Sequence, residues 1–130
     1  MTRILTIIAL LFATPAWAQK PYKGGDWVFI MEDSLASYYI DRDSIKIDGD
    51  LISFVSVQNA KKPDGFGPDT YLISEEINCV EGKQRTLSLT EWSKHYGRGK
   101  LITGDTASKK WMVWGNAKMM QHPFYGKLCR

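Results

Sequence analysis

The chain has 130 residues, of which 44% are hydrophobic and 24% charged, and its formal net charge at pH 7 is +3. This length is enough for one domain with a modest core, and no more. After the N-terminal segment, no apolar stretch reaches the roughly 20 residues that a membrane-spanning helix needs, which excludes a helical transmembrane domain.

The first residues have the three parts of a secretory signal peptide. A short basic start at residues 1–3 is followed by an apolar run over residues 4–13 and by a small-residue segment that ends at Ala18. We therefore predict a signal peptide over residues 1–18 and one exported domain over residues 19–130, located in the periplasm, in the medium or at the cell surface. No cysteine lies near the predicted cleavage site, so we expect no lipid anchor.

Short segments rich in aromatic and β-branched residues follow, separated by turn residues. The segment 71–79 is the most regular, because its apolar side chains fall on alternate positions, as in a strand with one buried face. Asp48 and Gly49 indicate a tight hairpin turn. Strands are predicted over residues 26–31, 37–41, 45–47, 51–60, 71–80 and 83–92.

The next part of the chain is less regular. Residues 93–108 are polar, basic and glycine-bearing, which predicts a long loop, and residues 109–114 predict a last strand. Consecutive strands joined by short turns form an antiparallel meander.

The C-terminal segment predicts a short helical cover for this sheet. Asn116 is expected to cap a helix over residues 117–128, which Pro123 and Gly126 reduce to one or two short turns. The predicted fold class is therefore α+β, mainly β: an antiparallel meander sheet covered on one face by a short C-terminal helical segment. The apolar side of the cover is expected to consist of Met119, Met120, Phe124, Tyr125 and Leu128.

Two cysteines, Cys79 and Cys129, are present. We expect an exported protein to meet an oxidising compartment, and two cysteines there are most simply one disulfide. Free thiols for metal or redox chemistry are the alternative, but the chain has no Cys-x-x-Cys, and neither histidine has metal-site spacing to a cysteine.

The sequence does not predict an enzyme. It contains no Gly-x-Ser-x-Gly, no phosphate-binding loop and no His-Glu-x-x-His. Glu75 and Glu76 would point to opposite faces of a strand, which argues against a glycosidase pair. We expect no cofactor and no metal site.

Charge is distributed unevenly along the chain. Residues 19–81 carry a net charge of −6 and residues 82–130 a net charge of +8. We expect neighbouring strands from the two halves to offset each other across the sheet. A basic surface that meets an anionic partner is the alternative.

The basic segment around Tyr96 is the main candidate for binding, although a solvated loop would have the same composition. Positive charge, aromatic residues and glycines together suit a sulfated glycan, an acidic protein or a nucleic acid. Of these we expect a protein partner and no nucleic acid. A free sheet edge is a second candidate, because it can pair with another chain. The candidate binding residues are Lys94, His95, Tyr96, Arg98, Lys100, Lys109 and Lys110.

A set of spaced residues across the exported part carries a family resemblance. They are Trp27, Tyr38–Asp41 with Ser44 and Ile45, the Asp48-Gly49 turn, the strand 51–57, Tyr71, Glu76–Cys79, Trp111 and Cys129. In these residues the chain resembles the surface-adhesin protein E family of Gram-negative bacteria.

The resemblance implies an antiparallel sheet with a C-terminal helix against it, a disulfide near that helix, and a homodimer. It also implies a non-catalytic binding module for extracellular-matrix proteins. The chain departs from the family in lacking a lipidation cysteine, which favours a periplasmic or released protein. The alternative function is therefore a periplasmic accessory or inhibitor protein of the cell envelope without a host partner.

Overall fold

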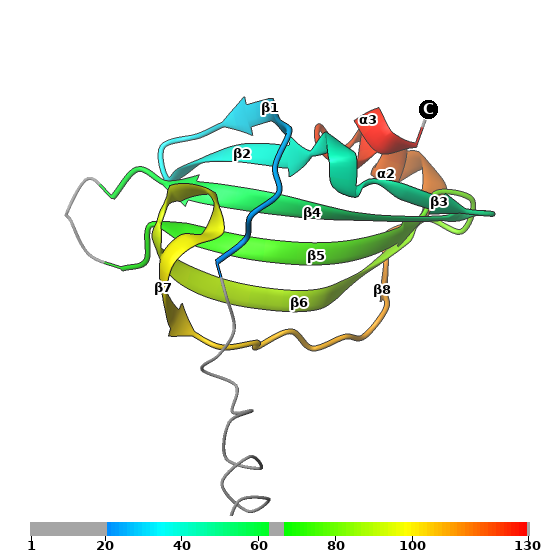
Figure 1. Cartoon of the computed structure of the whole chain (residues 1–130). Helices are drawn as coiled ribbons and strands as arrows, with labels where there is room; N and C mark the ends of the chain where they lie inside the picture. The colour runs from blue at the N-terminus through cyan, green and yellow to red at the C-terminus, as the bar shows by residue number, and fades with distance from the viewer. Residues whose placement is uncertain (1–20, 63–66, 130) are drawn as a thin grey trace, which may run out of the picture.

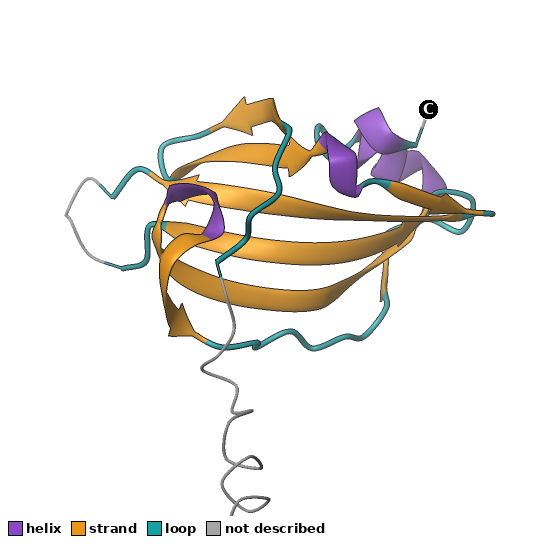
Figure 2. Cartoon of the chain, in the orientation of Figure 1, coloured by secondary structure: helices purple, strands orange, loops and turns teal. Residues whose placement is uncertain are grey.

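A computed structural model of the chain describes residues 21–62 and 67–129, and the predicted signal peptide lies outside these residues. The described residues form one antiparallel sheet with short helices at the C-terminus, which confirms the predicted fold class (Figures 1 and 2). No helix in this part of the chain is long and apolar enough to cross a membrane. The elements are β1 (Trp27–Glu32), β2 (Ala36–Asp41), η2 (Arg42–Ser44), β3 (Lys46–Asp48), β4 (Leu51–Ala60), β5 (Thr70–Asn78), β6 (Lys83–Lys94), η3 (His95–Gly97), β7 (Arg98–Thr103), β8 (Met112–Val113), α2 (Asn116–Gln121) and α3 (Tyr125–Leu128).

The sheet follows the chain order almost throughout. Its main path is β1-β2-β4-β5-β6-β7, and all of its pairs are antiparallel. The short strand β3 pairs with the start of β4, whereas β2 pairs with its end. In the same way β8 pairs with the start of β6, whereas β7 pairs with its end. Strands β1 and β7 therefore form the two edges of the main path.

The core lies between the sheet and the C-terminal helices. Phe54 and Ile77 extend from neighbouring central strands, and α2 and α3 cover them with Met119, Phe124 and Tyr125. Phe54 is 2% exposed, and Ile77 and Met119 are fully buried. Burying each of these side chains contributes about 1.5–3 kcal/mol, which explains why so short a helical segment stays on the sheet.

The cysteine pair joins the end of β5 to the end of α3. The two sulfur atoms of Cys79 and Cys129 lie 2.12 Å apart, at bonding distance. Both residues pack against the core, so the C-terminal segment is held to the sheet by contacts as well as by sulfur.

Asn116 is not the helix cap that the sequence predicts. The N-cap position of α2 is Gly115, and Asn116 is the first helical residue. Its side-chain amide instead donates to the carbonyl oxygens of Cys79 and Val80, in the turn after β5. Asn116 therefore links the helix to the sheet, which a capping pattern does not reveal. The helix break predicted at Pro123 is confirmed, because residues 122–124 separate α2 from α3. The break predicted at Gly126 is wrong, because Gly126 lies inside α3.

Two predictions for the region after residue 92 are wrong. Residues 93–108 are not one loop, because β6 continues to Lys94 and β7 forms after the turn η3. Gly99 permits this close pairing, since a Cβ atom there would lie 2.3 Å from the Ser93 hydroxyl oxygen. The strand predicted over residues 109–114 is also too long, as only Met112 and Val113 pair with β6.

Candidate binding surface

The candidate surface lies on the face of the sheet that α2 and α3 leave uncovered. Successive side chains of a strand point to opposite faces. Ile40 belongs to the core beneath the helices, so its neighbour Tyr39 points to the opposite face. Phe29 is directly paired with Tyr39 across β1 and β2 and lies beside it.

Five aromatic rings form a continuous row on this face, which we call the aromatic row. Its successive ring centroids are 5.4–5.6 Å apart, within the range of favourable aromatic pairs. The row is accessible at one end, where Phe29 is 50% exposed. In spatial order the aromatic row consists of Tyr22, Trp27, Tyr96, Tyr39 and Phe29.

Tyr96 reaches the row because the β6–β7 turn has an unusual backbone conformation. Its φ is +63°, in the left-handed region that a tyrosine rarely adopts. The backbone N–H of Tyr96 donates to the Asn59 side-chain oxygen at 2.9 Å, and the Thr70 hydroxyl donates to the Lys94 carbonyl at 2.6 Å. Asn59 and Thr70 are buried, so these bonds fix the turn against the ends of β4 and β5.

The other end of the row is held by the segment before β1, which crosses the sheet beside η3 (Figure 1). The backbone N–H of Tyr22 donates to the Gly97 carbonyl at 3.1 Å. Its hydroxyl donates to the carboxylate of Asp41, which is 1% exposed and also accepts from the Asp26 N–H at 2.9 Å. Burial, followed by this contact with Asp41, raises the pKa of Tyr22, so its hydroxyl stays protonated at neutral pH.

The predicted binding residues divide into two groups. Lys94, His95, Arg98 and Lys100 are exposed around the turn, next to Tyr96, and we call these four the basic hairpin. Within residues 21–62 and 67–129, every ion pair is made by other residues.

Lys109 and Lys110 are not part of this group. They lie between β7 and β8, where the chain runs back along β6 towards the start of that strand (Figure 1). Lys109 forms an ion pair with Asp105 at 3.3 Å. The structure therefore brings five of the seven predicted residues together and leaves these two apart.

Most of the aromatic row is missing from the residues that the sequence singles out. Trp27 and Phe29 are two positions apart in one strand, which places them on one face, and this signal was available. The contact between Trp27 and Tyr96 joins residues far apart in the chain, and no local pattern indicates it.

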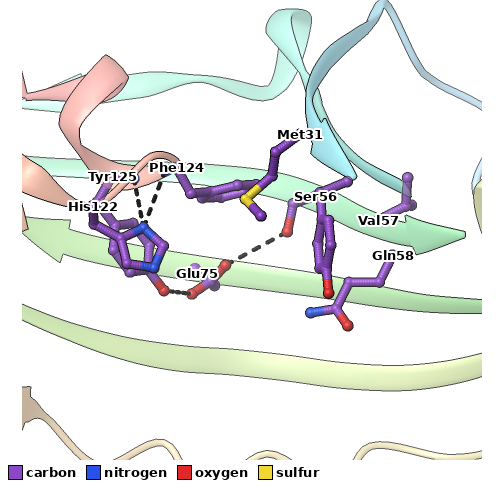
Figure 3. A pocket seen from close by; sticks show the side chains of 9 residues that line it. Met31, Ser56, Val57, Gln58, Glu75, His122, Phe124 and Tyr125 are labelled. Atoms are coloured by element: carbon purple, nitrogen blue, oxygen red, sulfur yellow. Dashed lines mark hydrogen bonds between the residues drawn. The ribbon is translucent and has the colours of Figure 1, made fainter. Parts of the chain in front are cut away.

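A cavity of about 280 Å³ lies on the other face of the sheet, beside α3 (Figure 3). Its lining includes the carboxylate of Glu75, a residue that is 6% exposed. Glu76, the next residue, points to the opposite face and pairs with Arg85 at 2.7 Å. Burial raises the pKa of Glu75, and hydrogen bonds from Tyr125, Gln84 and Ser56 offset only part of that effect.

In the described part of the chain, no group of three or more histidine, cysteine or acidic residues is arranged to hold a metal ion. No curated protein matches the sequence, and no solved structure matches it. A family model described as surface-adhesin protein E matches residues 27–129, which span β1 to the end of α3 and both cysteines. The chain belongs to the surface-adhesin protein E family.

Proposed function

We propose that the protein is an exported, non-catalytic binding module that recognises a protein partner through the aromatic row and the basic hairpin. The observation that carries this proposal is the unbroken contact of five aromatic rings beside four basic side chains. Family membership supports a surface-adhesin role in general terms.

The composition of this surface suits protein recognition. Tryptophan, tyrosine and arginine dominate the binding energy of protein interfaces, where truncating one such residue often costs more than 2 kcal/mol. The hydrogen bonds of Asn59 and Thr70 hold the turn in place before binding, so little conformational entropy remains to be lost on association. Lysine and arginine around the row would steer an acidic partner towards it.

An extracellular-matrix protein is the partner class that we propose, with laminin and vitronectin as probes. The test is biolayer interferometry at physiological salt with the mature protein. Replacing Phe29 and Arg98 by alanine should weaken binding at least tenfold, because both side chains are exposed at the surface and neither is in the core. Lys127→Ala is the matched control, since Lys127 is exposed on α3, behind the sheet, and should bind as the wild type does.

Equal binding by the double variant and the control would remove this surface from the proposal.

The alternative, a periplasmic accessory or inhibitor protein, makes a different prediction about location. Surface labelling of intact cells, followed by fractionation, should label the protein if it is an adhesin. Confinement of the unlabelled protein to the periplasm would favour the alternative.

A further inference from the structure

The carboxylate of Glu75 is buried with only one of its oxygens well satisfied. Its Oε1 atom accepts hydrogen bonds from the Tyr125 hydroxyl at 2.6 Å and from the Gln84 amide at 3.0 Å. Its Oε2 atom has one contact among the described residues, the Ser56 hydroxyl at 3.5 Å, which is at the long limit of a hydrogen bond. Burying a carboxylate with one poorly hydrogen-bonded oxygen costs folding free energy unless a further donor binds that oxygen.

The unsatisfied side of this carboxylate borders the cavity beside α3 (Figure 3). The rest of the lining is mainly apolar or aromatic and includes Met31, Tyr38 and Phe124. At about 280 Å³ the cavity is near the lower end of ligand pockets, which are roughly 300–1,000 Å³, so it suits a small group.

No lysine or arginine is among the described residues that line the cavity. His122 lines it, but its Nδ1 atom accepts from the backbone N–H groups of Phe124 and Tyr125, at 3.1 and 3.3 Å. An Nδ1 atom that accepts hydrogen bonds carries no proton, so His122 is in the neutral form. Burial also lowers the pKa of His122.

We propose that this cavity binds an organic cation: a primary ammonium or guanidinium group on an aliphatic stem. The charged head meets Oε2 of Glu75 and supplies a shorter hydrogen bond than the one from Ser56. The stem lies against Met31 and Phe124, and the rings of Tyr38 and Tyr125 favour a cation nearby. This site is on the opposite face from the aromatic row and does not depend on the proposed function.

Other ligand classes fit less well. Burial alone disfavours the ionised form of Glu75, and a bound cation stabilises that form. An anion would be repelled by the ionised form, and a neutral polar ligand would leave its charge uncompensated. A metal ion would need several ligands, and the cavity offers one carboxylate. The cation can come from two sources, a lysine or arginine side chain of a bound protein or a free small amine.

The test is an NMR titration of the ¹⁵N-labelled mature protein with n-butylammonium chloride. We expect saturable shifts of the Glu75, Phe124 and Tyr125 amides, and binding at least tenfold weaker for n-butanol, which has the same stem without the charge. Glu75→Gln should weaken n-butylammonium binding at least tenfold, because glutamine can keep the Tyr125 hydrogen bond but carries no charge. The matched control is Glu76→Gln, on the opposite face, which should bind as the wild type does.

Equal affinity for the amine and the alcohol, or unchanged amine affinity in Glu75→Gln, would overturn the proposal, and so would the absence of amine binding. A capped Ala-Lys-Ala peptide distinguishes the two sources: tighter binding than n-butylammonium assigns the site to a protein side chain, and weaker binding assigns it to a free amine. Matrix-protein binding is measured separately on the aromatic row, so either proposal can fail without the other.

Discussion

At the scale of single residues, Glu75 is the clearest conflict between burial and charge. It occupies a position of the inward face of β5, between Ile73 and Ile77, where an apolar side chain is expected. The sequence shows this placement of an acid among core positions. It does not show which residues hydrogen-bond to the acid, because Tyr125 is 50 residues away in the chain.

The raised pKa of Glu75 makes stability depend on pH. The folded protein holds this proton more tightly than the unfolded chain, whose glutamate has its ordinary pKa of 4.5. The free energy of unfolding therefore falls as pH rises from about the unfolded pKa through the folded pKa. Glu75→Gln removes this dependence on pH. We therefore expect the free energy of unfolding of the variant, relative to wild type, to rise with pH and to be about 1–3 kcal/mol higher at neutral pH. Urea unfolding between pH 4 and 8 measures it.

Glu76→Gln is again the matched control, because Glu76 is on the other face and forms an ion pair with Arg85. Its unfolding curves should lack the pH-dependent gain of Glu75→Gln. If both variants differ from wild type by an amount that does not change with pH, Glu75 does not hold its proton more tightly in the folded state.

At the scale of elements, the sequence predicts strands well and the β6–β7 turn poorly. Alternation over residues 71–79 and the Asp48-Gly49 turn are local signals, and the corresponding strands form. Gly97 in the turn and Gly99 in β7 give this region the composition of a loop, but both have positive φ and permit a tight reversal. Its conformation depends on Asn59, a residue from β4, so no pattern within the turn could predict it.

The Asn59 side chain should therefore control the order of the turn. Asn59→Ala removes the acceptor for the Tyr96 N–H and leaves a left-handed residue without its main support. We expect a loss of about 1–2 kcal/mol in stability and amide exchange of Tyr96 at least tenfold faster. Hydrogen exchange followed by NMR measures both local and global opening.

A substitution on the other face of the same strand provides the comparison. Gln58→Ala, one residue away, alters a half-buried side chain that lines the cavity and does not contact the turn. It should leave the exchange rate of Tyr96 unchanged. Similar exchange rates in wild type and Asn59→Ala would show that the Asn59 side chain does not control the order of the turn.

At the scale of the whole molecule, the two oppositely charged halves of the sequence meet in the sheet. Glu76 in β5 and Arg85 in β6 are directly paired, with a nitrogen–oxygen distance of 2.7 Å. The Arg85 guanidinium and the Lys83 ammonium also lie 4.5 Å from the ring centroid of Trp111. Opposite charges on β5 and β6 therefore offset each other, as the sequence predicts. The basic hairpin stays exposed, so cross-strand pairing and an exposed basic surface occur in different parts of the molecule.

The link between Cys79 and Cys129 connects the sheet to the C-terminal helices. It joins residues 50 positions apart and holds the helical cover on the sheet. Closing a loop of this length stabilises a protein by roughly 4 kcal/mol on the chain-entropy model. Cys79→Ser should therefore lower the melting temperature by more than about 10 °C, as measured by circular dichroism, and reductant should lower that of the wild type similarly.

Mass spectrometry of the native protein should show one intramolecular disulfide, and two freely alkylated thiols would contradict it. Cys129→Ser is the matched variant and should melt at the same temperature as Cys79→Ser, because each removes the same link.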